Sequence, residues 1–286
     1  MKNTFRLLNH ISIFLLMVAL CMPATAASLE DMIKQAMTGD HRDEKNVARD
    51  DYRHPGETLT FMGVTPDMTV VEIWPSRGWY TEILAPVLRE KGKYYAASFS
   101  PSAKRTPDWR KTMHKNFLEK LQKRPDVYDR IIITELSVPE QTRIAPPGSV
   151  DMVLTFRNVH NWMNGDYAEE MFVVMSRALK SGGILGVTEH RAKPGTSIYA
   201  MKKSGYITEA HVIALAKQAG LVLEEKSEIN ANPKDSKDHP KGVWTLPPSL
   251  RHCRSMENQT EKNRCMDKYQ PIGESDRMTL RFRKSG

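Results

Sequence analysis

Segments that read as β-strands alternate with segments that read as α-helices over most of the chain, and this alternation restricts the possible folds more than any other feature. The expected strands are short, rich in β-branched residues and flanked by turn residues: 69–74, 93–98, 131–135, 150–156, 184–189, 221–229 and 278–282. Segments with the apolar spacing of amphipathic helices lie between them, at 79–88, 108–124, 166–179 and 208–219. Such an alternation predicts a mostly parallel sheet with helices on both faces.

Two parts of the chain fall outside this alternation. Residues 27–63 hold two helical segments, 28–39 and 57–62, which predict an N-terminal helical cap ahead of an α/β domain over 64–286. Residues 230–275 are polar and rich in proline, and they separate the last two strands. We expect these two strands to pair antiparallel, because no clear helix connects them, and we expect 230–275 to form an irregular insertion.

The first 26 residues have the pattern of a secretory signal peptide. Lys2 and Arg6 precede a largely apolar run of 12 residues over 11–22, and the small residues Ala24 and Ala26 follow it. A run of this length is too short to cross a bilayer, which takes about 20 apolar residues. We therefore predict cleavage after Ala26 and an exported mature chain without stable membrane insertion, with the periplasm as the expected compartment.

The mature chain is mildly basic. The net charge of +8 at pH 7 falls to +6 when Lys2 and Arg6 leave with the signal peptide. A bias of this size is typical of a well-solvated surface and is weak support for nucleic-acid binding. We therefore expect no nucleic-acid partner. The hydrophobic fraction of 40% is enough for a globular core.

Two cysteines remain after export. Cys21 lies in the signal peptide, whereas Cys253 and Cys265 lie 12 residues apart in the polar insertion. In an oxidising compartment we expect these two to form a disulfide. The alternatives are two free thiols or a metal site, for which His252 is the one close additional ligand.

Candidate ligand-binding residues follow three of the predicted strands. Glu72 lies near the end of the first strand, Asn158 and His160 follow the fourth, and Glu189 and His190 end the fifth. In doubly wound sheets, ligands bind at the carboxyl ends of the strands. Glu72 is expected to contact a ribose or nearby backbone amides, or to cap the adjacent turn.

These stretches resemble class I S-adenosylmethionine-dependent methyltransferases. The resemblance covers 69–88, 150–185, the strand ending at His190, and 208–225. More narrowly, the chain is similar to a family of exported predicted methyltransferases through YRHP at 52–55, EIWP at 72–75, RNVHNW at 157–162, KDHP at 237–240 and GESDRM at 273–278. The resemblance implies a doubly wound, mostly parallel, seven-stranded Rossmann-like sheet with an antiparallel last strand. It also implies S-adenosylmethionine as the cofactor.

The cofactor residues that the resemblance implies depart from the general pattern. That pattern is an acid followed by glycines at alternate positions, and here Trp74 and Ser76 replace the first two glycines while Gly78 remains. The acid expected after the second strand to bind the ribose is replaced by Ser98 or Ser100. The resulting cofactor-binding set is Glu72, Trp74, Ser76, Gly78, Ser98 and Asn158.

Three residues are candidates for proton transfer. His160 and His190 are possible bases near neutral pH, and Glu189 is a possible acid–base partner. The alternatives are a loop held by side-chain hydrogen bonds around His160 and an ion pair that closes the strand end at Glu189. The sequence shows no metal-binding motif.

The resemblance implies one function, and the predicted export leaves a second one open. The first is methyl transfer from S-adenosylmethionine to an unidentified acceptor, which we expect to be a small molecule. The second is an exported, non-catalytic binding module that keeps the fold and has lost or changed its cofactor. The second hypothesis arises because S-adenosylmethionine is made in the cytosol, whereas the signal peptide predicts export. Such a module would bind another ligand or a protein partner, whose identity the sequence leaves unknown.

Overall fold

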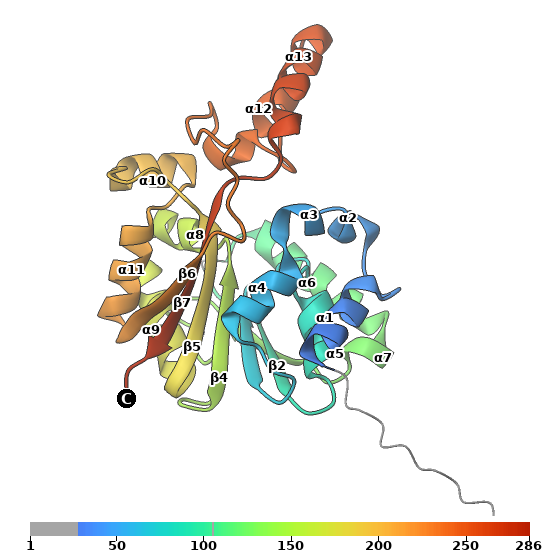
Figure 1. The fold of residues 1–286 in the computed structure, drawn as a ribbon, viewed down its shortest axis with the longest axis vertical. Helices are drawn as coiled ribbons and strands as arrows, with labels where there is room; N and C mark the ends of the chain where they lie inside the picture. Colours follow the sequence, from blue (N-terminus) through green and yellow to red (C-terminus); the bar gives the residue numbers. More distant parts are fainter. Residues whose placement is uncertain (1–27, 105) are drawn as a thin grey trace, which may run out of the picture.

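The computed structural model describes residues 28–104 and 106–286, so the predicted signal peptide lies outside the described residues. Within them, seven strands form one sheet: β1 (Thr69–Ile73), β2 (Lys93–Phe99), β3 (Ile132–Leu136), β4 (Val150–Phe156), β5 (Leu179–His190), β6 (Leu221–Ser227) and β7 (Arg277–Lys284). Their order is β3-β2-β1-β4-β5-β7-β6 (Figure 1). All seven strands predicted from the sequence are therefore present.

The sheet is parallel except for its last strand. The pairs β2–β3, β1–β2, β1–β4 and β4–β5 are parallel, whereas β7 is antiparallel to both β5 and β6. β7 therefore lies between β5 and β6, and β6 forms the edge. This arrangement confirms the doubly wound, seven-stranded sheet with an antiparallel last strand.

Helices cover both faces because successive strand residues point to opposite sides. Val70 and Met152 lie in a hydrophobic cluster with one group of helices, namely α1 (Leu29–Thr38), α4 (Pro55–Met62), α5 (Thr81–Leu88), α6 (Asp108–Gln122) and α7 (Pro125–Tyr128). Val71 and Val153 lie in a second cluster with α8 (Val159–Asn164), α9 (Ala168–Ala178), α10 (Ile198–Ser204) and α11 (Glu209–Gln218). No helix among the described residues is both long and apolar enough to cross a membrane.

The N-terminal segment packs against the sheet through α1 and α4. Ser28 caps α1 in a capping box with Asp31, and α1 buries Ile33 and Ala36 in the same cluster as α5. Two short helices that were not predicted, α2 (Glu44–Val47) and α3 (Asp50–Arg53), connect α1 to α4. Figure 1 shows α2 and α3 near the end of the sheet from which the insertion rises.

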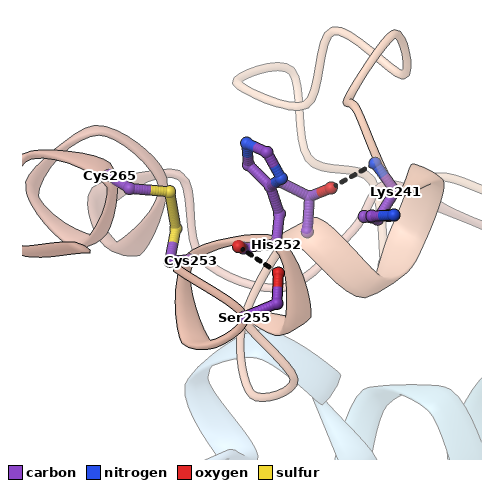
Figure 2. Close-up of a disulfide and its surroundings, with 6 residues drawn as sticks. Lys241, His252, Cys253, Ser255 and Cys265 are labelled. Atoms are coloured by element: carbon purple, nitrogen blue, oxygen red, sulfur yellow. Dashed lines mark hydrogen bonds between the residues drawn. A yellow bond between two sulfur atoms is a disulfide. The ribbon is translucent and has the colours of Figure 1, made fainter. Parts of the chain in front are cut away.

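The insertion before β7 is more regular than expected. It contains the 3-10 helices η1 (Gly242–Thr245) and η2 (Gln270–Ile272), and the α-helices α12 (Arg251–Arg254) and α13 (Gln259–Tyr269). The predicted disulfide is confirmed: Cys253 of α12 is bonded to Cys265 of α13, with a Cα–Cα distance of 5.4 Å (Figure 2). With Leu246, Leu250 and Tyr269, the disulfide forms a small core separate from the two main clusters.

Hydrogen bonds to Asp235 connect the base of the insertion to the segments that precede α11 and β7. The carboxylate accepts from the hydroxyl of Tyr206 (2.9 Å), from the backbone N–H of Asp276 (2.8 Å) and from Nε2 of His239 (2.8 Å). Asp235 is almost fully buried. The insertion is therefore fixed at its base, while α12 and α13 project outward (Figure 1).

Candidate functional site

Two cavities that share a wall lie where β1, β4 and β5 end. The larger has a volume of about 620 Å³ and the smaller a volume of about 270 Å³. The shared wall comes from the β1–α5 turn, α6, the end of β4 and the insertion: Trp74, Ser76, Met113, Phe156, Arg157, Pro248 and Ser249. This is the edge of a doubly wound sheet at which ligands bind.

The turn between β1 and α5 keeps a glycine-like backbone although it contains one glycine. φ is +46° at Trp74, +58° at Ser76 and +76° at Gly78. Ser76 Oγ donates to the Trp74 carbonyl (3.2 Å), and Trp74 Nε1 donates to the Leu136 carbonyl (3.1 Å). At Gly78, a Cβ would lie 3.1 Å from the ring of Phe117. The turn therefore has the backbone shape that glycines at these positions would permit.

Glu72, near the end of β1, is hydrogen-bonded to the helix that follows this turn and to the neighbouring strand. Its Oε2 accepts hydrogen bonds from Thr81 Oγ1 (3.0 Å) and from the hydroxyl of Tyr94. Burial raises the pKa of Glu72 to about 7, although these two hydrogen bonds act in the opposite direction. Glu72 also borders the larger cavity, so ligand contact and support of the turn both have a structural basis.

A carboxylate from β3 lies near the end of β2, and the sequence did not reveal this. Ser98 lies outside both cavity walls and is hydrogen-bonded to Nδ1 of His114 (3.0 Å). Ser100 Oγ donates to Oε2 of Glu135 at 2.5 Å. Glu135 lies on β3, in register with Ser98. An acid therefore reaches the end of β2 from the neighbouring strand, and pairing between distant segments brings it there.

Asn158 connects the ends of two central strands. Its Nδ2 donates to the Ile73 carbonyl at the end of β1 (2.9 Å) and to Thr155 Oγ1 in β4 (3.2 Å). The side chain is buried, and the residue borders the smaller cavity. Asn158 thus holds the shape of the site from within its wall.

His160, Glu189 and His190 meet beside the smaller cavity. Glu189 is fully buried, and its Oε1 accepts from His160 Nδ1 (3.0 Å) and from the backbone N–H of His190 (2.8 Å). Its Oε2 accepts from the backbone N–H of His160 (3.2 Å). Because a carboxylate only accepts, Nδ1 of His160 carries the proton and Nε2 is left as an acceptor. Both histidines border the cavity.

His190 is held in its neutral form. Burial lowers the pKa of His190 well below its ordinary value, and the positive charges of nearby arginines, Arg157 among them, add to this effect. Nδ1 of His190 lies 2.5 Å from Ser275 Oγ. Two imidazoles therefore face the cavity from adjacent positions, with ring centroids 5.1 Å apart.

The same three residues have a spacing that a metal ion could use. One possible ligand atom from each residue lies within 4.8 Å of the other two, so these three described residues could hold a metal ion. However, the Glu189 carboxylate already accepts three N–H groups, and Arg157 brings positive charge to the same wall. The hydrogen bonds therefore favour an acid–base role over a metal role.

Several cations border the larger cavity, and sequence analysis did not single them out as site residues. They come from the N-terminal segment, the β1–α5 turn, the end of β4 and the insertion: Lys45, Arg49, Arg53, Arg77, Arg157 and Arg254. The spacing of Arg49 and Arg53, four residues apart, is a local signal that both could lie on one side of a helix. Arg77 is exposed and lies at the rim of the cavity.

Comparison with known proteins places the fold. The sequence matches no protein-family model and no curated protein. Among solved structures, the chain is similar to the assigned sarcosine dimethylglycine methyltransferase of Galdieria sulphuraria, with 15% identity and a TM-score of 0.54 over 86% of this chain and 88% of that chain. It is also similar to the cyclase SpnF, with 13% identity and a TM-score of 0.55 over 87% and 85% of the two chains.

A third neighbour was solved with a cofactor product. The geranyl diphosphate C-methyltransferase of Streptomyces coelicolor, in complex with Mg²⁺, geranyl diphosphate and S-adenosyl-L-homocysteine, has 12% identity and a TM-score of 0.50 over 87% of each chain. Similarity at these identities concerns the fold. The chain has the seven-stranded fold of class I S-adenosylmethionine-dependent methyltransferases.

Proposed function

We propose that this protein transfers a methyl group from S-adenosylmethionine to a small-molecule acceptor bound in the two joined cavities. The observation that carries the proposal is the β1–α5 turn. Its positive φ values at Trp74, Ser76 and Gly78 give the backbone a glycine-type shape beside a cavity in a methyltransferase fold. The cavity volume of about 620 Å³ is in the range of small-molecule sites.

The proposed cofactor contacts are made by the turn and the strand ends. Trp74, Ser76 and Asn158 border the smaller cavity, and Glu72 borders the larger one. Gly78 and Ser98 border neither cavity. Their proposed contribution is therefore to hold the residues that form the cavity walls. When bound, S-adenosylmethionine supplies an electrophilic methyl group on a positively charged sulfur.

His160 is the proposed general base, oriented by Glu189. The hydrogen bond from Nδ1 to Glu189 (3.0 Å) leaves Nε2 free to accept a proton from the acceptor. His190 is proposed to assist as a second neutral imidazole at the same wall. The remaining task of the chain is to align the acceptor with the methyl group, which itself lowers the barrier.

Export is part of the proposal. The sequence pattern of 1–26 supports a signal peptide, and the disulfide between Cys253 and Cys265 supports an oxidising compartment such as the periplasm. The acceptor and the cofactor would then meet the enzyme outside the cytosol.

A second candidate is a non-catalytic binding module. It is favoured because the chain has no acid of its own directly after β2, and because Ser98 is engaged by His114 and Ser100 by Glu135. In this case the cavities hold a different ligand, and changes at His160 leave binding intact.

The test is a calorimetric titration of the oxidised mature chain, residues 27–286, with S-adenosylmethionine and S-adenosylhomocysteine. We expect saturable one-to-one binding with a Kd near or below about 100 μM. An Arg77→Gly variant tests whether the arginine at the rim restricts entry. If neither the folded natural chain nor the Arg77→Gly variant binds either compound, the methyltransferase proposal is ruled out and the binding module remains.

A further inference from the structure

Four arginines surround a single carboxylate at the junction of the N-terminal segment and the insertion. Glu274 is nearly buried, and its oxygens contact Arg49 Nε (2.5 Å), Arg53 Nε (3.2 Å) and Arg277 Nη1 (3.4 Å). Burial alone would raise the pKa of Glu274, but Arg53, Arg277, Arg157 and Arg49 together lower it to about 2. The carboxylate is therefore ionised near neutral pH, and four arginines surround this one acidic group.

Part of this cluster has hydrogen-bonding capacity that the protein does not use. Nη2 of Arg49 and Nη2 of Arg53 are buried and have no hydrogen-bond partner among the described residues. Arg53 is 2% exposed. A buried guanidinium nitrogen without a partner is costly. This free energy is recovered if a ligand brings a hydrogen-bond acceptor to these two nitrogens.

Arg157 is the member of the cluster most available to a ligand. It is half-buried and borders both cavities, and its guanidinium makes no hydrogen bond or ion pair with any residue that the structure describes. Its backbone has a φ of +59°, a strained value for a residue with a Cβ. Burial lowers the pKa of Arg157 to about 10, so the side chain stays positive near neutral pH.

The arginines are held in place before any ligand arrives. The guanidinium of Arg53 lies over the ring of Trp79, 4.6 Å from its centroid, and Trp79 Nε1 donates to the Asn46 carbonyl (2.9 Å). The ion pairs with Glu274 fix Arg49 and Arg53 from the other side. A preorganised site loses less entropy on binding than a mobile one.

S-adenosylmethionine does not balance this charge. Its sulfonium and ammonium groups outnumber its one carboxylate, so the cofactor adds a net positive charge to the site. The rim of the larger cavity adds further cations, Lys45, Arg77 and Arg254. Glu72 borders the same cavity, but its carboxylate is engaged by Thr81 and Tyr94. A second, negatively charged ligand would compensate the excess of basic side chains at this wall.

We propose that the cavity region around Arg49, Arg53 and Arg157 binds a compact dianionic group, either a phosphate or a pair of carboxylates, on a small molecule. Guanidinium groups match the oxygens of both groups through paired, charge-assisted hydrogen bonds. Identifying this small molecule as the methyl acceptor rests on the proposed function, whereas the anion site itself does not.

The binding experiment uses the oxidised mature chain in a chloride buffer near neutral pH. Inorganic phosphate, pyrophosphate, succinate and citrate are titrated separately by calorimetry, with the melting temperature as a second readout. We expect saturable binding of at least one anion and a rise in Tm, since a ligand that binds the native state stabilises it. Tighter binding of phosphate and pyrophosphate identifies a phosphate ligand, and tighter binding of succinate or citrate identifies a carboxylate ligand.

Three variants locate the anion. Arg157→Met should weaken binding by about tenfold or more. Arg157→Lys should weaken it less, because lysine keeps the positive charge although it lacks the paired N–H donors of the guanidinium. Arg254→Met changes an exposed rim residue and should weaken binding without affecting folding. The matched control is Arg264→Met, an exposed arginine of α13 outside the cavity walls, which should change nothing.

The outcomes separate this inference from the proposed function. Anion binding that Arg157→Met and Arg254→Met weaken supports the site even if S-adenosylmethionine fails to bind. No binding of any of the four anions up to about 10 mM overturns the anion site. An equal loss in Arg264→Met overturns it too, because the effect is then one of overall charge. A positive S-adenosylmethionine titration beside a negative anion titration leaves the methyltransferase proposal standing alone.

Discussion

At the scale of single residues, the site concentrates backbone conformations that residues with a Cβ avoid. Trp74, Ser76 and Arg157 all have positive φ and all border the cavities. Each such residue costs about 1 to 2 kcal/mol relative to glycine in the same conformation. Packing and hydrogen bonds of the surrounding sheet must hold them there, which is typical of positions that shape a binding site.

Replacing Ser76 tests this strain directly. We expect Ser76→Gly to be more stable than Ser76→Ala by about 1 kcal/mol, because glycine adopts a φ of +58° without a clash whereas alanine keeps the strain and loses the bond to the Trp74 carbonyl. Urea unfolding of the two variants measures the difference. Equal stabilities would contradict a strained turn.

The hydrogen bond between Glu189 and His160 leads to a second residue-scale prediction. In Glu189→Gln the charged acceptor is lost, so we expect the Nδ1–H form of His160 to fall in population and the protein to lose about 2 kcal/mol of stability. Nitrogen chemical shifts of the imidazole report the tautomer. With a methyl acceptor that must lose a proton, kcat should fall by about 10²-fold or more, while cofactor affinity should change little.

Glu170→Gln is the control for that experiment, because Glu170 is exposed on α9. It should leave the His160 tautomer and the stability unchanged. An unaltered tautomer in Glu189→Gln itself would mean that Glu189 closes the strand end and does not orient the base.

At the scale of elements, β1, β2 and α5 are joined through one buried carboxyl group. Glu72 of β1 accepts hydrogen bonds from Thr81 of α5 and Tyr94 of β2. All three side chains are buried. The turn that borders the cavities therefore begins next to this buried, hydrogen-bonded group. The protonation state of Glu72 should affect the stability of the folded protein.

This joint should make stability depend on pH. Because burial raises the pKa of Glu72 to about 7, the folded chain holds this proton more tightly than the unfolded chain, whose ordinary value is 4.5. The stabilisation is fully present below pH 4.5 and is lost as pH rises through about 7. Glu72→Gln mimics the protonated form, so the stability of the natural chain relative to this variant should decrease across that window.

Urea unfolding of both chains at intervals from pH 4.5 to 8 measures this difference. Taking the difference between the chains removes the contribution of other groups, including His190. The lowered pKa of His190 acts with the opposite sign, because stability from a buried neutral histidine falls as pH drops below its ordinary value of 6.5. A flat difference curve would contradict the raised pKa, because it would mean that Glu72 has the same pKa in the folded and unfolded chains.

At the scale of the whole molecule, two additions to the sheet close the site. The N-terminal segment contributes Lys45, Arg49 and Arg53 to the wall of the larger cavity, and the insertion contributes Pro248, Ser249 and Arg254. The ion pairs between Arg49, Arg53 and Glu274 join these two parts of the chain. Ligand binding should therefore depend on how firmly the insertion is held.

Removing the disulfide tests this dependence. In the double variant Cys253→Ser, Cys265→Ser, the insertion should lose about 3 kcal/mol of local stability, since a short closed loop contributes roughly that much in the chain-entropy model. Amide hydrogen exchange should rise over 242–272 and stay low in β4 and β5, which belong to the main clusters. Ligand affinity should weaken, because Arg254 lies in α12.

A uniform increase in exchange across both the sheet and the insertion would contradict this picture. It would mean that the disulfide supports the entire fold and not the wall of the site alone.

Local pattern alone determined the framework of this protein. The β-branched strands and the amphipathic helices between them predicted the sheet, because each element carries its own periodicity and its own turn residues. The pairing of Cys253 with Cys265 was also within reach, since two cysteines leave one intramolecular disulfide. The positions of Glu72, Asn158, His160 and Glu189 at strand ends followed from the same alternation.

Only the tertiary structure decided what surrounds those residues. The insertion helices have few apolar residues, so their sequence lacks the periodicity that would have predicted them, and the disulfide core supplies their packing. Glu135 reaches Ser100 through strand pairing. Arg49, Arg157 and Glu274 are far apart in the chain and meet because the N-terminal segment and the insertion both fold over the ends of β1 and β4. A charge cluster built from long-range contacts has no local sequence pattern, so only the folded chain shows it.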